Sequence, residues 1–335
     1  MNNLRYLKKV TTEKALNAGK VLGSYYYSRM HGKPTMRGLP INLSIEPTTS
    51  CNLRCPECPS GLRSFTRSTG MIDYDLYTKI IDEVRGHLIH ILLYFQGEPY
   101  LHNQFFDLVK YASLNGIYTA TSTNAHYLNE ENAKATVQSG LDKLIVSIDG
   151  STQETYEQYR IGGSIEKVIE GTKNVVAWKK KLGSAKPHLI FQYLVVKPNE
   201  HQIDEVQKIA RSIGVDEVVF KTAQIYDFEN GSPLIPDNPK YSRYRQGSDG
   251  KYSLKNDLLN QCWKMWHSCV ITWDGKVVPC CFDKDASHQM GDLKNESLKN
   301  IWYGEAYQQF RQSILKSRSE IEICKNCSEG TKVWA

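Results

Sequence analysis

Three cysteines stand close together near the start of the chain, in the stretch TTSCNLRCPECPSG. Cys51, Cys55 and Cys58 have the spacing C-x-x-x-C-x-x-C. Cysteine thiolates hold iron-sulfur clusters, and a cubane 4Fe-4S cluster takes four ligands. A local set of three can leave one iron open to bind a small molecule directly. The stretch is therefore a candidate site for chemistry at a metal.

Further polar groups occur where buried strands are expected to end. Gly97 and Glu98 stand in the sequence Gln96-Gly97-Glu98-Pro99, and hydroxyl, amide and carboxylate groups follow at Ser122, Asn124, Ser147 and Asp149. The carboxyl ends of parallel strands meet at one rim, so these groups are expected to converge. Taken singly, Gly-Glu-Pro is a common turn, and each other residue is about as often a cap or turn residue as a ligand contact.

The elements that would position these groups alternate along the chain. Short β-branched or aromatic runs alternate with helical patterns, which is typical of strand-helix units and a parallel sheet. Strands are expected at 41–46, 90–95, 118–122, 143–148, 188–196 and 217–221. Six units are too few to close an eight-stranded barrel. The predicted fold is α/β: a partial (β/α)6 TIM-like barrel with a small C-terminal cysteine-rich α+β domain.

Over about residues 41 to 225, these motifs together resemble the radical S-adenosylmethionine (SAM) family. The resemblance implies that the open iron of a cluster on the three cysteines chelates SAM. Reductive cleavage of SAM then gives a 5'-deoxyadenosyl radical, which abstracts hydrogen from a substrate. The implied cofactor-binding residues are Gly97, Glu98, Ser122, Asn124, Ser147, Asp149 and Arg160, with Glu98 on the methionine ammonium and Arg160 on its carboxylate.

The sequence departs from the family pattern at two positions. Gln96 stands first in a motif that is Gly-Gly-Glu-Pro in the family, and Glu57 stands before the third cysteine, where the family often has an aromatic residue. The second departure leaves the packing of the adenine open. No residue is assigned a catalytic role beyond cofactor binding.

Six of the nine cysteines lie in residues 261–335. The stretch CWKMWHSCVITWDGKVVPCCFD and the final CKNC resemble the SPASM/twitch extension of this family. The resemblance implies one auxiliary 4Fe-4S cluster on Cys262, Cys280, Cys324 and Cys327, hence two clusters in total. Four thiolates would close that cluster to substrate and suit it to electron transfer.

Two cysteines of this region are left without an assignment. Cys281 could replace Cys280 as a ligand. Cys269 and the remaining member of that pair are either buried inert thiols or, in a sharper hypothesis, a hydrogen donor or a completing ligand. A zinc ribbon that joins the pair Cys55 and Cys58 to the pair Cys324 and Cys327 is a competing interpretation, but it leaves Cys51 and the strand-end motifs unexplained.

Composition bounds the rest of the interpretation. The 335 residues include no apolar run long enough to span a bilayer and no signal-peptide pattern, and free cysteines suit a reducing cytosol, so a cytoplasmic protein is expected. Residues 1–40 are predicted to form a basic helical arm packed on the main domain. Its apolar side is expected to carry Leu4, Leu7, Val10, Leu16, Val21, Leu22 and Tyr25. This arm has either a solvated face or a docking face for an anionic substrate or partner. The expected division continues with a barrel at 41–226, a linker or lid at 227–260 and the cluster domain at 261–335.

The expected activity is hydrogen abstraction from a peptide or small-molecule substrate, with the auxiliary cluster accepting an electron in a net oxidation. A redox-neutral epimerisation or rearrangement with a cysteine hydrogen donor is the alternative reaction. A non-catalytic iron-sulfur or zinc-binding scaffold is the alternative of another class. A reducing donor such as flavodoxin or ferredoxin is an expected partner. Nucleic acid is not favoured, because no segment apart from the N-terminal arm has the basic and aromatic pattern of a nucleic-acid-binding helix.

Overall fold

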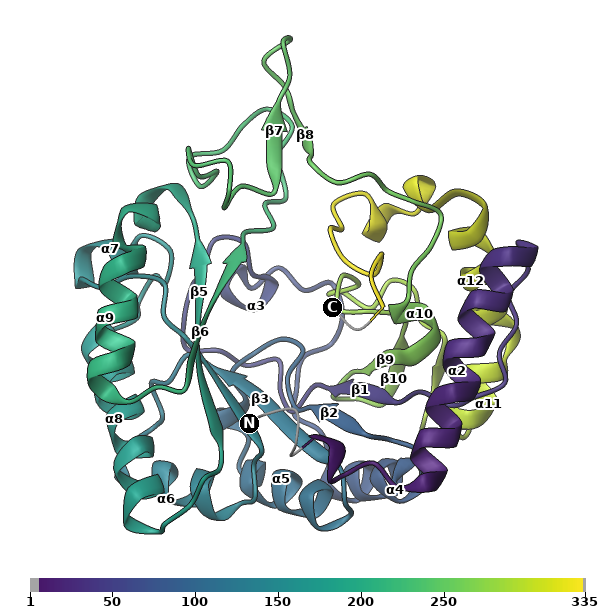
Figure 1. Ribbon diagram of the computed structural model, residues 1–335, viewed down its shortest axis with the longest axis horizontal. Coiled ribbons are helices and arrows are strands. Elements are labelled where there is room, and N and C mark those ends of the chain that lie inside the picture. Colours follow the sequence, from purple (N-terminus) through teal and green to yellow (C-terminus); the bar gives the residue numbers. More distant parts are fainter. Residues whose placement is uncertain (1–5, 334–335) are drawn as a thin grey trace.

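The computed structural model describes residues 6–333, and its centre is a curved parallel sheet (Figure 1). Strands β1 to β6 lie side by side in chain order, all parallel. Each predicted strand is present, within one to three residues at its ends: β1 Asn42–Ile45, β2 His90–Leu92, β3 Tyr118–Thr123, β4 Lys143–Ser147, β5 His188–Val195 and β6 Glu217–Thr222.

Helices connect these strands and cover the outer face of the sheet (Figure 1). The short helix α3 Pro59–Leu62 follows the first cysteine motif, and 3-10 turns η1 Pro99–Leu101 and η2 Lys197–Gln202 follow β2 and β5. The longer helices are α4 Tyr74–Val84, α5 Phe105–Leu114, α6 Glu130–Gln138, α7 Gln153–Glu157, α8 Ile165–Lys181 and α9 Ile203–Ile213.

The two faces of the sheet are packed differently. Leu43, Ile45 and Val146 are buried in the main core. Side chains alternate between faces along a strand, so the residues between them point into the barrel. Asn42 and Ser44, for example, are only half-buried. The helices thus cover one face of the sheet, while the other face lines the interior of the barrel. The polar residues stand at the rim formed by the carboxyl ends of the strands. The predicted partial barrel is confirmed.

The C-terminal region extends this same sheet. A hairpin turns at Asp274-Gly275, with β9 Ser268–Ile271 antiparallel to β10 Lys276–Val278 and Gly275 at φ +87° in the turn. Beyond the prediction, β9 pairs in parallel with β1. Among residues 6–333 the sheet therefore has nine strands, in the order β11-β10-β9-β1-β2-β3-β4-β5-β6, with β11 at Gly291–Asp292.

Further helices and 3-10 turns complete the C-terminal region. They are α10 Lys264–His267, α11 Leu298–Tyr303, α12 Glu305–Ser317, η3 Arg318–Glu320 and η4 Glu322–Cys324. The segment 227–260 forms a separate hairpin of β7 Tyr244–Gln246 and β8 Tyr252–Leu254, which projects from the upper edge in Figure 1. No helix within residues 6–333 is long and apolar enough to cross a membrane.

The N-terminal helix is present as α2 Thr12–His31, capped by the Thr11 side chain. Of the predicted apolar side, Val21 and Tyr25 are buried and Val10 and Leu22 pack against the same cluster. Leu16, at 64% exposed, and Leu7, which precedes the helix and is 62% exposed, differ from the prediction, and Leu4 lies outside the described residues. The helix packs against α10 through Tyr25, whose ring meets Trp263 and Trp266 edge-on. The neighbouring helix therefore decides which side is buried, and hydropathy alone does not reveal it.

Candidate functional site

One pocket at the rim of the barrel gathers nearly all residues that the sequence singled out there. It is lined by Cys51, Cys55, Cys58, Gly97, Glu98, Ser122, Asn124, Ser147 and Arg160. These residues come from the loop after β1 and from the ends of β2, β3 and β4, with Arg160 from the turn after α7. The expected convergence is observed for every predicted residue except Asp149.

Cys51 and Cys55 have hydrogen-bond donors beside their sulfurs, whereas Cys58 Sγ lies 3.8 Å from the acceptor Gln96 Oε1. Cys51 Sγ accepts from the backbone N–H of Leu53 at 3.4 Å and lies 3.9 Å from Asn124 Nδ2, and Cys55 Sγ lies 3.8 Å from Arg160 Nη1. Burial raises the pKa of the Cys51 thiol to about 11 and also raises that of Cys55. Buried thiols that stay protonated until a metal displaces the proton, with N–H groups aimed at sulfur, fit a cluster site.

Glu98 is a buried carboxylate held by neutral donors. It is 2% exposed, and its oxygens accept from Thr123 Oγ1 at 2.7 Å, Asn124 N at 2.7 Å and Tyr100 N at 3.2 Å. Burial raises its pKa to about 7, although these hydrogen bonds oppose the shift. A buried carboxylate with no ion-pair partner among the described residues is suited to receive a cationic group of a ligand.

Gly97 is required by the backbone that brings Glu98 to the pocket. Its φ is +73°, and a Cβ there would lie 2.2 Å from the carbonyl oxygen of Thr48. Its N–H donates to Ser60 Oγ at 2.9 Å, which ties the motif to α3. Only glycine fits both the left-handed conformation and the close approach of two backbones.

Asp149 has a task that the sequence did not indicate. Its carboxylate forms an ion pair with Arg160 Nε and accepts from the backbone N–H of Leu194 at 2.7 Å. The side chain is fully buried and does not line the pocket. Asp149 therefore orients Arg160, and Arg160 is the group that faces the thiols.

Some pocket residues were missed. Leu53, Gly61, Tyr94 and Thr123 also line the pocket. Tyr94 lies at the end of the expected second strand, two residues before Gln96, so its place in that strand was the available signal. Glu57, which stands where the family often has an aromatic residue, instead accepts from the backbone N–H of Tyr226 at 2.9 Å. It holds the chain as it leaves the barrel.

A second group of thiols lies in the C-terminal region. Cys262, Cys324 and Cys327 are buried, and Cys280 interacts electrostatically with Cys262 and Cys327. The four predicted auxiliary residues are thus brought together. The pairs that a zinc ribbon would join lie in different sites, since Cys55 and Cys58 line the first pocket. Within residues 6–333 no three ligating side chains surround a single-ion position, whereas the ligands of a cubane each bind a different iron.

Arg318 is a buried cation among these thiols, and the sequence did not reveal it. Its Nη2 lies 3.1 Å from Cys327 Sγ and donates to the carbonyl of Glu329 at 2.7 Å, while Nη1 donates to the carbonyl of Gln261 at 2.9 Å. Its Nε is buried without a partner among the described residues. A guanidinium with an unused donor fits a site that holds negative charge.

Of the two remaining cysteines, Cys281 adjoins Cys280 and interacts with it electrostatically, whereas Cys269 lies apart in the main core. Cys281 is exposed and lies 3.8 Å from Lys264 Nζ. Cys269 is on β9 in the main core, 1% exposed, and burial raises its pKa to about 12. Cys280 therefore faces the other thiols, and Cys269 has the surroundings of an inert buried thiol.

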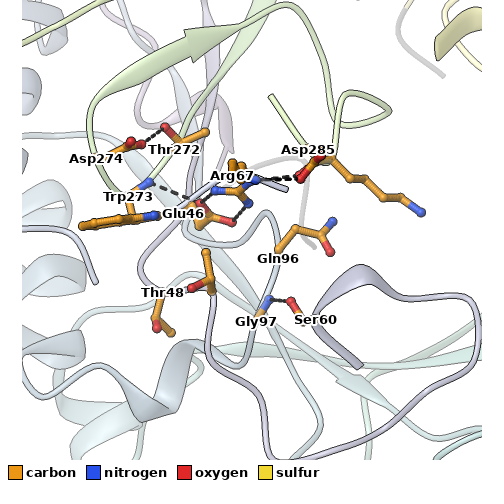
Figure 2. Close-up of polar contacts among 12 residues, drawn as sticks. Glu46, Thr48, Ser60, Arg67, Gln96, Gly97, Thr272, Trp273, Asp274 and Asp285 are labelled. Carbon is orange, nitrogen blue, oxygen red and sulfur yellow. Dashed lines mark hydrogen bonds and ion pairs between the residues drawn. The ribbon is translucent and has the colours of Figure 1, made fainter. Parts of the chain in front are cut away.

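A buried ion pair connects the two cysteine regions (Figure 2). Arg67, in the loop after α3, donates from Nη1 and Nη2 to the two oxygens of Glu46 at 2.8 and 2.6 Å. Glu46 ends β1, and the exposed fractions of the two side chains are 5% for Arg67 and 0% for Glu46. Parallel bonds between a guanidinium and a carboxylate fix both distance and orientation.

The same pair holds the C-terminal hairpin. Arg67 Nε donates to the carbonyl of Lys284 at 3.1 Å, and Glu46 accepts from the backbone N–H of Trp273 at 3.2 Å. Nearby, Asp285 accepts from the backbone N–H of Thr66 at 2.9 Å. The loop that follows Cys58 is therefore bonded to the segment that follows Cys281. We name Glu46, Arg67 and Asp285 the inter-site clamp.

Comparison with known proteins decides the family. Residues 45–184 match the model of the radical SAM superfamily, and residues 262–328 match that of SPASM, an iron-sulfur cluster-binding domain. The chain belongs to the radical SAM superfamily. It is an enzyme of that superfamily with a SPASM domain, and its cofactors are 4Fe-4S clusters and SAM, as the sequence predicted.

Individual relatives agree with this placement. A tungsten-containing aldehyde ferredoxin oxidoreductase cofactor-modifying protein of Pyrococcus furiosus is 26% identical over 329 residues, which cover 85% of this chain and 86% of the relative. The structure of BtrN with AdoMet and 2-DOIA is 17% identical, with TM-score 0.55, and covers 88% of this chain and 95% of its own. Streptococcus suis SuiB bound to precursor peptide SuiA is 15% identical, with TM-score 0.61, and covers 93% and 75%.

The clamp generates a stability prediction. Arg67→Met leaves the buried Glu46 carboxylate without its ion-pair partner, so the free energy of unfolding is expected to fall by about 3–5 kcal/mol. Adding Glu46→Gln should recover part of this loss, because the unpaired charge is then removed. Urea unfolding of both variants measures the effect.

The control is Arg85→Met, which removes an arginine from an exposed ion pair with Asp82. A change below about 1 kcal/mol is expected there. Equal losses for Arg67→Met and Arg85→Met would contradict a stabilising role for the clamp.

Proposed function

We propose that Cys51, Cys55 and Cys58 hold the SAM-binding 4Fe-4S cluster, and that Cys262, Cys280, Cys324 and Cys327 hold a closed auxiliary cluster. The observation that carries the proposal is the single pocket that joins three thiols to the strand-end groups. When bound, the cluster and SAM supply the one-electron chemistry that generates a hydrogen-abstracting radical. The protein's task is to bind, orient and enclose these groups.

Each pocket residue has a role that its surroundings support. Glu98 would accept from the methionine ammonium, since it is a buried carboxylate at the pocket wall. Arg160, held by Asp149, would meet the methionine carboxylate. Ser122, Asn124 and Ser147 would present hydroxyl and amide groups to the ribose and carboxylate, and Gly97 would let the backbone approach.

The proposed reaction is hydrogen abstraction from a peptide or small molecule, followed by loss of an electron to the auxiliary cluster. Among the similar proteins, the curated relative is named for modifying a cofactor and SuiB is crystallised with a precursor peptide, so both substrate classes remain in the proposal. The buried place of Cys269 argues against this thiol as the hydrogen donor of the redox-neutral alternative, because a thiol in the core is poorly placed to return hydrogen to a substrate radical at the rim.

The first prediction concerns the metal content. We expect about eight irons per chain after anaerobic reconstitution, and about four in the Cys51→Ala/Cys55→Ala/Cys58→Ala variant, which should release no 5'-deoxyadenosine under dithionite. Cys269→Ala is the matched control and should keep both clusters and SAM cleavage. Zinc in place of iron, or a fully loaded protein that cleaves no SAM, would support a scaffold instead.

The second prediction separates the adjacent cysteines. Cys280→Ala should lower the iron content to about four and leave the first cluster, because Cys280 faces the other auxiliary thiols. Cys281→Ala should keep about eight, because this thiol is exposed. Iron analysis with electron paramagnetic resonance of the reduced protein measures both. The reverse pattern would assign the ligand to Cys281.

The third prediction is a pH dependence. With a pKa of about 7, Glu98 is largely protonated at pH 6 and largely ionised at pH 7.5. Proton competition should therefore raise the affinity for SAM about eightfold from about pH 6 to pH 7.5. In Glu98→Gln the affinity should be lower and this rise absent. Anaerobic calorimetry measures it, and an unchanged pH profile in Glu98→Gln would remove Glu98 from ammonium binding.

Raising the pH should have the opposite effect on stability: it raises the affinity for SAM but lowers the contribution of Glu98 to the free energy of unfolding. The folded form without cofactor binds the Glu98 proton more tightly than the unfolded form, whose pKa is near 4.5. The contribution of Glu98 to the free energy of unfolding should therefore fall as pH rises from about 4.5 to 7, and bound SAM should reduce that loss.

A further inference from the structure

The outward face of α2 carries apolar and aromatic side chains that are largely or partly exposed. Leu16, Tyr26, Tyr27 and Met30 are 64%, 46%, 47% and 81% exposed. Gly19 and Gly23 lie between them along the helix, and a Cβ at either would meet no atom within 4 Å. A contiguous exposed surface of this composition is typical of a protein interface, where Tyr and Met are enriched.

Cations surround this apolar stripe. Lys20, Arg29, Lys33 and Arg37 are exposed, and none forms an ion pair with an acid among the residues that the structure describes. Residues 1–38 contain a single acid, Glu13. We name the exposed side of α2, together with Lys33 and Arg37, the basic face. Its charge favours a negatively charged partner.

The basic face lies directly over the auxiliary thiols. Val21 and Tyr25, on the buried side of α2, belong to one apolar cluster with Cys262 and Trp263, and Cys280 packs against that cluster. Figure 1 shows α2 alongside α10 and α12, on the side of the molecule opposite α8. One helix layer therefore separates this surface from the proposed auxiliary cluster.

Tyr25 spans that layer. Its ring lies 5.4 Å from the guanidinium carbon of the exposed Arg29 and 5.2 Å from the ring of Trp263. Tyr25 also interacts electrostatically with Cys262. Aromatic rings thus connect the surface cation with the thiol region.

We propose that the basic face is the docking site of an acidic one-electron carrier protein of the ferredoxin or flavodoxin type, which exchanges electrons with the auxiliary cluster. The proposal rests on the proposed function for its redox role. In each turnover the substrate radical loses one electron to the auxiliary cluster and one proton to solvent. The oxidised carrier then takes that electron and leaves in its one-electron-reduced form.

Charge favours this occupant over a second copy of the chain. Two basic faces brought together would place at least eight cations opposite one another, on the four named per face, which opposes association. An anionic membrane or a nucleic acid would match the charge, but neither uses the position over the auxiliary thiols. These occupants are outcomes of the test.

The test is charge reversal on the full chain with both clusters loaded. Lys20→Glu/Arg29→Glu/Lys33→Glu removes the positive face, and Lys167→Glu/Lys173→Glu/Lys180→Glu makes the same change in net charge at exposed positions of α8. Binding of an acidic bacterial ferredoxin is measured by anaerobic calorimetry at about 50 and 200 mM salt. We expect at least a tenfold loss of affinity in the α2 variant, less than twofold in the α8 variant, and weaker wild-type binding at the higher salt.

A second measurement follows electron transfer separately from catalysis. In the Cys51→Ala/Cys55→Ala/Cys58→Ala background, the dithionite-reduced auxiliary cluster is mixed with oxidised ferredoxin, and its reoxidation is followed by absorbance. The α2 reversal should slow the second-order rate at least tenfold, and the α8 reversal should not. An auxiliary cluster that fails to form or to be reduced contradicts the proposed function, whereas ferredoxin binding to the basic face is scored independently.

Equal ferredoxin affinity for wild type and both reversals would overturn the proposal, and so would wild-type protein that binds no ferredoxin. Binding to phosphatidylglycerol vesicles or to single-stranded DNA that only the α2 reversal abolishes, with no ferredoxin binding, would assign the face to that partner instead.

Discussion

The parallel pairing of β1 with β9 is the constraint on which the arrangement of both sites depends. β1 also pairs with β2, so it is the strand that the barrel and the C-terminal hairpin share. Glu46 ends this strand and accepts from both Arg67 and the Trp273 backbone. The first cysteine motif begins five residues later. Because hydrogen-bonded strands and a buried ion pair permit little relative movement, the two cysteine sites are held within one rigid framework.

Connections above the rim reinforce that framework. Ile235 of the segment 227–260 packs in a cluster with Leu53 and Cys55. Asn326 stands between Cys324 and Cys327 in the sequence, and its side chain accepts a hydrogen bond of 2.9 Å from the Tyr244 hydroxyl. The segment therefore contacts both cysteine regions, and the expectation of a linker or lid describes only part of its contacts.

Much of the barrel could be predicted because its strands carry strong local patterns. The six β-branched runs, and the residues at their ends, identified the rim pocket almost completely. Asp149 was the exception. A carboxylate at a strand end could contact the cofactor, and the sequence does not reveal that Asp149 instead forms an ion pair with Arg160. A residue that contacts the ligand and a residue that orients such a contact look alike in the sequence at such a site.

Residues whose roles come from distant partners could not be predicted. Arg67 and Arg318 occur in polar stretches that resemble ordinary surface loops, yet the side chains of both are buried because segments far along the chain surround them. The exposure of Leu16 was not predicted for the same reason, since α10 packs on the side of α2 that carries Val21 and Tyr25. The entry of β9 into the main sheet likewise depends on an edge of β1 that the local pattern does not describe.

The order of synthesis follows from the β1–β9 pairing. During translation β1 emerges early, whereas its partner Ser268–Ile271 is made more than 200 residues later. One edge of β1 is therefore unpaired while most of the chain is made, and long-range pairing of this kind forms late. Until it forms, neither Trp273 nor Lys284 can fasten the loop beyond Cys58. While most of the chain is being made, the first cysteine motif is therefore not yet fastened to the C-terminal region.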